Sequence, residues 1–204
     1  MRKIKLFLLI CTVILAVSFC TACSSGGDDG NSPPTVEIGS AEDLQKIGSS
    51  GYPLNAVYEL QTDIVVTGNW IPIGAGSNKP FTGTFKGNGY SVTLSDPDTS
   101  AAATITLIDE DGSFTLAAVG FFAYTKDGGI ENLEIITNFI GDVEMDYALS
   151  HFGVVAGYAE NTRLKNVTVS GNALSVKGTN ANYVGAGGIV GVLTGNSVMS
   201  GKPP

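Results

Sequence analysis

A short glycine-led pattern occurs three times in the second half of the chain and limits the fold more than any other feature. It starts at Gly120, Gly153 and Gly188, and each of these glycines is followed by two β-branched or aromatic residues. The first two copies lead through a turn into a second apolar run, at 130–135 and 164–169. The starting glycines are 33 and 35 residues apart. Such a period indicates an array built from one supersecondary unit per repeat.

The residues of this repeat exclude the helical repeats of similar length. The chain holds 27 glycines, and apolar and polar residues alternate within the runs with a period of two, as they do in half-buried strands. We therefore predict an all-β fold in which the strands of successive repeats stack in parallel. Glycine at each corner would permit positive φ and a close approach between neighbouring turns of the stack.

Two asparagines, Asn132 and Asn166, occupy the same place in their repeats. We expect both at bends, because asparagine tolerates the left-handed conformation. Their stacked amides would then form a structural ladder between successive repeats, with Ile135 stacked on Val169. The alternative is two unrelated turn asparagines.

Two elements upstream of the repeats can also be predicted. Residues 80–94 hold two alternating strand patterns joined by a glycine-rich corner at 86–89. Ser40 followed by acidic residues, with Leu44 and Ile47 on one face and Gly48 as a stop, predicts a short α-helix. We expect this helix to cap the open N-terminal end of the stack.

The first residues predict export. Residues 1–22 have a basic start, an apolar run and a small residue before Cys23, as in a secretory signal. Thr21 to Ser24 resembles the bacterial lipobox, in which the cysteine becomes the lipidated first residue. We therefore expect a lipid anchor on Cys23 and an outer-membrane or cell-surface location. An ordinary cleaved signal is the alternative. Residues 23–35 are small, acidic and proline-containing, which predicts a flexible tether before a domain at 36–204.

A family resemblance supports this organisation. Gly188-Ile-Val-Gly191 and Gly120-Phe-Phe-Ala123 resemble the GLUG motif, whose core is Gly-Leu-any-Gly. The stretches 70–74 and 81–90 resemble the unit that often precedes GLUG repeats. The resemblance covers about residues 38–200. It implies a right-handed parallel β-helix, or β-solenoid, in an adhesin-like surface lipoprotein with no established catalytic residues.

The charge balance argues against nucleic acid as a partner. The chain has 19 acidic and 11 basic side chains, and three of the basic ones lie in the predicted leader. An acidic surface of this kind repels phosphate backbones.

The sequence offers little catalytic chemistry, and we predict no cofactor and no metal. The single histidine, His151, stands beside Ser150 without an evident triad partner. Asp142, Glu144 and Asp146 alternate along a predicted strand, and Asp109, Glu110 and Asp111 crowd a turn. A solvated acidic face is the first interpretation of these groups, and a calcium site is the second.

Two functions remain. The first is a non-catalytic, adhesin-like module that binds an extracellular glycan or protein, with Tyr124, Tyr147 and Tyr158 as its candidate binding face. Packing in the core is the alternative role of these tyrosines. The second function is a β-helical polysaccharide lyase or glycoside hydrolase, for which Arg163 and Lys165 are the available bases.

Overall fold

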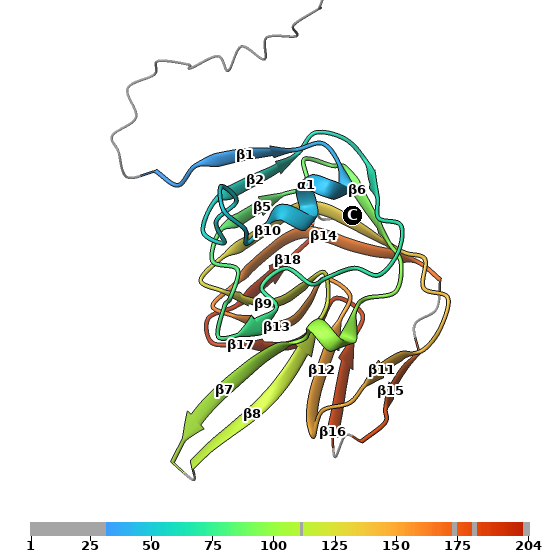
Figure 1. Cartoon of the computed structure of the whole chain (residues 1–204). Helices are drawn as coiled ribbons and strands as arrows, with labels where there is room; N and C mark the ends of the chain where they lie inside the picture. Colours follow the sequence, from blue (N-terminus) through green and yellow to red (C-terminus); the bar gives the residue numbers. More distant parts are fainter. Residues whose placement is uncertain (1–31, 111, 173–174, 181–182, 202–204) are drawn as a thin grey trace, which may run out of the picture. The chain divides into compact units, whose positions relative to one another are not determined.

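A computed structural model describes residues 32–110, 112–172, 175–180 and 183–201 of the chain (Figure 1). The predicted leader and Cys23 lie outside the described residues. The described part is built from β-strands with one six-residue α-helix, so the all-β prediction is confirmed. A compact unit begins at Pro33 and its first strand begins at Thr35, so the predicted tether ends inside the folded unit. Among the described residues, no helix has the length and apolarity needed to cross a membrane.

The largest sheet has eight strands, in the order β1-β2-β5-β10-β14-β18 with β3 and β6 beside this path. Its strands are β1 (Thr35–Ile38), β2 (Val57–Leu60), β3 (Ile64–Val65), β5 (Thr84–Lys86), β6 (Ser91–Leu94), β10 (Gly129–Thr137), β14 (Arg163–Gly171) and β18 (Val198–Ser200). β5 and β6 pair with successive parts of β10. The predicted glycine-rich corner therefore joins two strands that lie end to end along the same neighbour.

Three smaller sheets complete the fold. They have the orders β16-β12-β8-β7-β4, β17-β13-β9 and β11-β15. Their strands are β4 (Gly76–Ser77), β7 (Ala103–Asp109), β8 (Gly112–Val119), β9 (Phe122–Lys126), β11 (Val143–Met145), β12 (Leu149–Gly153), β13 (Ala156–Glu160), β15 (Val176–Gly178), β16 (Tyr183–Gly187) and β17 (Val190–Thr194). A single turn of 3₁₀-helix, η1 (Thr99–Ala101), precedes β7.

The repeats pair in parallel, as predicted. Ala156 of the second repeat pairs with Phe122 of the first and with Val190 of the third. In the large sheet, Ile135 pairs with Val169, which confirms the predicted stacking. The exception among the described strand pairs is β7 with β8, which is antiparallel. The sequence predicts a strand over 101–108 and the acidic turn after it, but the second strand was not predicted.

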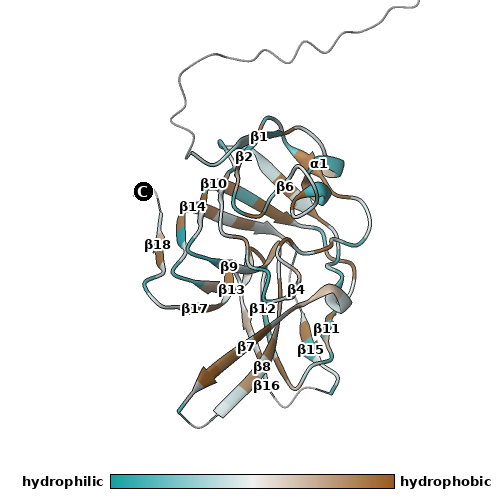
Figure 2. Cartoon of the chain, turned by 60° about the vertical axis from the view of Figure 1, so that its left-hand side comes forward, coloured by the Kyte–Doolittle hydropathy of each residue, from teal (hydrophilic) through white to brown (hydrophobic). Residues whose placement is uncertain are grey.

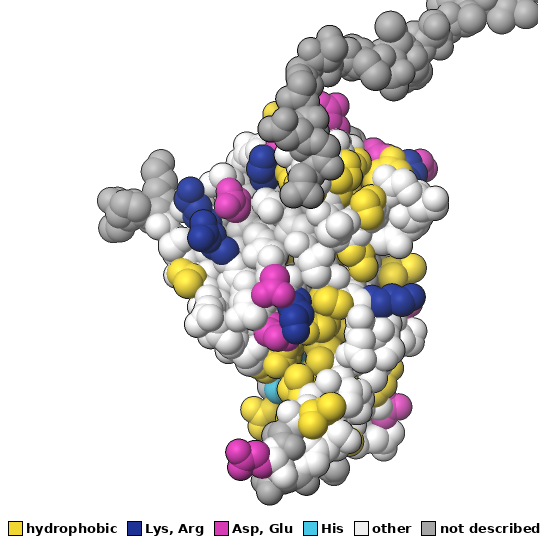
Figure 3. Space-filling model, turned by 90° about the vertical axis from the view of Figure 1, so that its left-hand side faces the viewer, with side chains coloured by type: hydrophobic (Ala, Val, Ile, Leu, Met, Phe, Trp, Pro, Cys, Tyr) yellow, Lys and Arg dark blue, Asp and Glu magenta, His cyan; other side chains and the backbone are white. Residues whose placement is uncertain are grey.

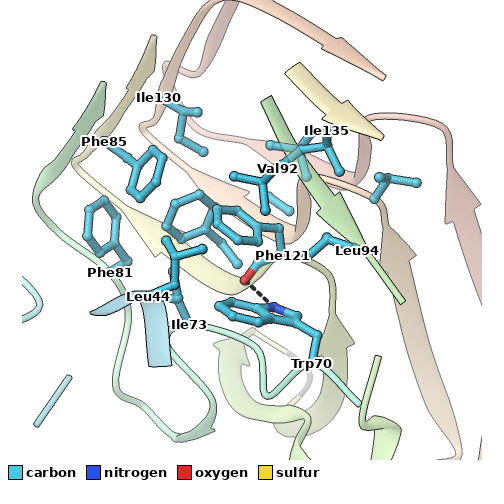
Figure 4. Close-up of a cluster of buried hydrophobic side chains, with 14 of the residues drawn as sticks. Leu44, Trp70, Ile73, Phe81, Phe85, Val92, Leu94, Phe121, Ile130 and Ile135 are labelled. Carbon is cyan, nitrogen blue, oxygen red and sulfur yellow. Dashed lines mark hydrogen bonds between the residues drawn. The ribbon is translucent and has the colours of Figure 1, made fainter. Parts of the chain in front are cut away.

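An aromatic cluster fills the core between the sheets (Figure 4). Trp70 stacks on Phe121 at a ring-centroid distance of 4.9 Å, and its Nε1 donates a hydrogen bond of 3.0 Å to the Phe121 carbonyl. Phe121 also contacts Phe85 and Phe122 edge to face. The indole is therefore buried with its one polar atom satisfied, and it fixes the 70–74 segment against β9.

The predicted helix is α1 (Ala41–Lys46), and its capping follows the sequence. The Ser40 hydroxyl accepts a hydrogen bond of 3.2 Å from the Asp43 backbone N–H, and Asp43 and Lys46 form an ion pair of 2.8 Å. Gly48 has a φ of +98° just after the helix. Leu44 is fully buried in the aromatic core, which joins α1 to the sheets.

A second, smaller core lies between the five-stranded and the three-stranded sheet. Its buried side chains come from β7, β8, β9 and β13, and they are Ala103, Ile105, Leu116, Ala118, Ala123, Tyr124 and Tyr158. These contacts fix the base of the β7–β8 hairpin against β9 and β13. The rest of the hairpin extends away from the stacked strands (Figure 1).

Candidate functional site

The β7–β8 hairpin creates the site, and its sequence explains why it forms. Isoleucine and leucine alternate with threonine in β7, an acidic turn follows, and a second alternating run forms β8. Ile105 lies opposite Leu116 and Leu107 lies opposite Phe114, so both pairs are on the face toward β9. Figure 2 shows β7 as one of the more hydrophobic strands.

The outer edge of β7 has a partner only at its start. β4 pairs with Ala103 and Thr104, and the Asn78 backbone N–H then donates to the Thr104 carbonyl at 3.2 Å. Asn78 has a φ of 48°, and no described strand continues the ladder beyond it. Alternation along the strand directs the N–H and C=O of Thr106 and Ile108 to this outer edge. Within the described residues these groups lack a strand partner.

A surface cavity of about 410 Å³ runs along this edge. We call it the hairpin groove, and it is lined by Asn78, Pro80, Ile105, Thr106, Leu107, Ile108, Tyr124, Lys126 and Glu160. Four consecutive β7 residues line it, and consecutive side chains point to opposite faces of a strand. The groove therefore follows the strand edge and does not lie over one face. On the side of the molecule seen in Figure 3, hydrophobic side chains gather with acidic and basic ones beside them.

The polar wall of the groove is a connected set of three side chains. The Lys126 ammonium lies 2.9 Å from Oε1 of Glu160, and the Tyr124 hydroxyl donates a hydrogen bond of 2.7 Å to Oε2. The Tyr124 hydrogen bond, with help from Lys126, lowers the pKa of Glu160. Burial and the same hydrogen bond raise the pKa of Tyr124, so its neutral form is stabilised. Both carboxylate oxygens of Glu160 are thus engaged, and this wall is suited to contact and orientation of a ligand.

The three predicted tyrosines do not form one exposed face. Tyr124 and Tyr158 do lie together, with ring centroids 5.5 Å apart, but their side chains are only 5% and 4% exposed. The prediction that these two rings form an exposed binding surface is wrong, because both rings fill the second core. Tyr124 reaches the groove through its hydroxyl. Tyr147 is 36% exposed and lines another surface cavity, with Thr99 and Ser100.

The predicted asparagine ladder is present. Nδ2 of Asn166 donates a hydrogen bond of 2.9 Å to Oδ1 of Asn132, and the two residues have φ values of 52° and 51°. Asn132 is exposed and Asn166 is half-buried, so the ladder is more open to solvent than a core hydrogen bond. It contributes to the alignment of β10 with β14 at the surface.

His151 lies in the five-stranded sheet, on β12 between Ala118 of β8 and Gly185 of β16. Its Nδ1 is buried and has no hydrogen-bond partner among the described residues. Burial lowers its pKa. A Cβ at residue 185 would lie 2.6 Å from Nδ1, so the glycine makes room for the imidazole. Its ring contacts Tyr183 edge to face.

The residues named for the lyase alternative are on another surface. Arg163 and Lys165 are exposed on either side of buried Leu164, as predicted. Arg163 lines a polar cavity of about 370 Å³ together with Asp127 and Glu131. The described residues contain no group of three or more histidine, cysteine, aspartate or glutamate side chains placed to hold a metal ion.

The predicted acidic strand face is confirmed. Asp142, Glu144 and Asp146 are exposed while Val143 and Met145 between them are buried. Asp142 pairs with Lys177. Asp146 accepts a hydrogen bond of 3.2 Å from the Thr179 hydroxyl. Two of the three carboxylates are thus engaged by neighbouring side chains of the next repeat.

Most residues of the hairpin groove were not predicted from the sequence. The signal for the hairpin was available, since two alternating runs flank the acidic turn at 109–112. The meeting of Glu160 with Lys126 and Tyr124 depends on the stacking register, in which Glu160 pairs with Lys126 across β13 and β9. That register follows from the repeat length.

Comparisons of the chain with protein-family models, with curated proteins and with solved structures found no match.

Proposed function

We propose that this chain is a non-catalytic, adhesin-like binding module that a lipid on Cys23 anchors at the cell surface. The observation that carries the proposal is the hairpin groove. Its ionisable side chains satisfy one another, apolar side chains form most of the remaining wall beside Asn78 and Thr106, and a strand edge without a described partner runs along it. These features favour adhesion of a ligand, whereas proton transfer needs a group held near its titration point.

We also propose that the stacked strands form a right-handed parallel β-helix with α1 as its cap. Support comes from the parallel registers between successive repeats. Crossover connections between parallel strands of one sheet are right-handed in about 98% of cases. The GLUG-like motifs of the sequence agree with this architecture, and β1, the first strand of the large sheet, directly precedes α1.

Among the ligands considered, the groove favours protein over glycan. Glycan-binding surfaces commonly present the faces of aromatic rings, and the rings of Tyr124 and Tyr158 are buried here. What the groove presents is aliphatic side chains and backbone hydrogen-bonding groups, which match a polypeptide.

Anchoring and binding are tested separately. Cys23→Ser should move the full chain from the membrane fraction to the soluble fraction, and unchanged partitioning would contradict the anchor. The soluble Cys23→Ser chain is then screened against immobilised extracellular proteins and glycans. We expect binding that Leu107→Asp, in the groove, weakens at least tenfold. Val65→Asp is the matched control, because Val65 is 63% exposed and lies on another sheet.

The same preparation decides between a binding module and an enzyme. We expect bound ligands to be recovered unchanged in mass. Release of unsaturated products from an acidic polysaccharide, with loss of that activity in Arg163→Ala, would contradict the proposal and support the lyase.

A further inference from the structure

The unpaired edge of β7 points to a specific kind of partner. Thr106 and Ile108 direct a row of backbone N–H and C=O groups into the hairpin groove, and such a row is complementary to the backbone of another extended chain. β4 already pairs with this edge for two residues, which shows that the edge has the geometry of a strand ladder. The groove continues where β4 ends.

We propose that the outer edge of β7 binds an extended polypeptide strand that carries basic residues, and that this strand extends the five-stranded sheet. The inference rests on the proposed binding function and names its ligand class. The added strand would pair with Thr106 and Ile108. Every second side chain of it would face the groove, beside Leu107 and the Tyr124, Lys126 and Glu160 wall.

The hairpin has a second edge, which provides an internal comparison. β8 pairs with β12 only at 117–119, so Thr115 lies beyond that ladder. The described cavities include one along the β7 edge that is walled by β9 and β13 residues. A strand beside β7 would therefore contact side chains as well as backbone, and this favours the β7 edge over the β8 edge.

The acidic charge of the protein favours a partner that carries basic residues. Glu110, in the turn that joins β7 to β8, is exposed, and the chain has 19 acidic against 11 basic side chains. Lys126 is already paired with Glu160. A second copy of this chain would bring an equally acidic surface to the edge, whereas a basic strand is attracted to it.

The test uses the full chain with Cys23→Ser and a synthetic peptide of alternating valine and threonine with lysine at both ends. We expect saturable binding that weakens at least tenfold when glutamate replaces the lysines. Binding should be lost when alternate peptide nitrogens are methylated, because methylation removes the N–H donors. In hydrogen exchange, the amides of Thr106 and Ile108 should become protected and that of Thr115 should not.

Two proline variants of the protein localise the site. Ile108→Pro removes an outward N–H at the β7 edge, and Thr115→Pro removes one at the β8 edge, so both spare the ladder between the two strands. We expect Ile108→Pro alone to weaken peptide binding at least tenfold. No binding by the wild-type chain, or equal effects of the two variants, would overturn the proposal.

The remaining outcomes separate this inference from the proposed function. If a partner from the protein and glycan screen binds Ile108→Pro as well as wild type, the binding module stands and strand addition is overturned. If the wild-type chain forms dimers in light scattering that Ile108→Pro abolishes, the occupant is a second copy, and the basic partner is overturned.

Discussion

Strands in the middle of the repeats have neighbours along both edges, whereas the β7–β8 hairpin has them along only part of its length. β13 lies between β9 and β17, and β10 lies between β14 on one side and β5 and β6 on the other. Beyond Thr104, the described partner of β7 is β8 alone. The inner strands of the stack therefore pair along both edges, whereas the hairpin leaves backbone groups of β7 without a described strand partner.

The two regions also differ in how their pairing is specified. Strands of the repeats pair across about 34 residues, for example Ile130 with Leu164, and this register requires nearly constant spacing in each repeat. The hairpin pairs locally, with Asp109 opposite Gly112. The hairpin precedes the first repeat at Gly120, so it leaves the register of the later repeats unchanged and gives the stack a projecting edge.

The largest expected effect contrasts one phenylalanine in each region. Phe121 is fully buried against Trp70, and Phe121→Ala should lower the free energy of unfolding by about 4 kcal/mol, from lost burial and the cavity left behind. Phe114 in the hairpin is 39% exposed, and Phe114→Ala should cost less than about 1 kcal/mol. Urea denaturation followed by circular dichroism measures both. Equal losses would contradict the view that the hairpin contributes little to stability.

A glycine pair tests the close approach between successive repeats. A Cβ at Gly157 would lie 2.4 Å from the backbone nitrogen of Val119, and backbone cannot move aside as a side chain can. Gly157→Ala should therefore cost about 2–3 kcal/mol. Gly141→Ala is the control, since a Cβ there meets nothing within 4 Å. Similar denaturation midpoints for the two variants would show that the stack tolerates separation.

Much of the stack could be predicted from the sequence because its determinants are periodic. Glycine-led runs at near-constant spacing predicted parallel stacking, the Asn132–Asn166 contact and the pairing of Ile135 with Val169. Ser40 and Gly48 predicted the ends of α1. Each of these depends on local conformation or on the repeat length alone.

The site was predicted less well, because it depends on how two sheets meet. The burial of Tyr124 and Tyr158 could not be deduced, since it depends on β7, which has no counterpart in the described later repeats. The polar wall of the hairpin groove likewise joins Glu160 to residues of another repeat that are far away in sequence. A hairpin prediction over 103–119 would have shown the free edge, but not the groove beside it.

A smaller effect is expected from the asparagine ladder. Asn166→Ala removes a hydrogen bond that is open to solvent and places alanine at a φ of 52°. We expect a loss of about 1 kcal/mol, because an exposed hydrogen bond contributes less than a buried one and the left-handed conformation is unfavourable for alanine. Asn166→Gly should lose less, since glycine adopts this φ freely. Equal losses for the two variants would assign the stability to the amide and not to the backbone conformation.

The smallest effect is a pH dependence at the junction of the two regions. His151 is on β12, which pairs with β8 of the hairpin and with β16 of the repeats. Burial lowers the pKa of His151 in the folded chain, whereas the unfolded chain titrates near about 6.5. As the pH falls through that value, the unfolded state therefore binds more protons than the folded state. The contribution of the neutral imidazole to stability is therefore fully present above about pH 6.5, and it is lost as the pH falls toward the lowered pKa of the folded chain.

We expect the wild-type chain to lose more stability than His151→Gln between pH 7.5 and 5.5, a window in which the carboxylates remain ionised. Unfolding free energies at both pH values measure this difference. Parallel pH profiles for the two chains would mean that the imidazole gains a proton as easily in the folded state as in the unfolded one.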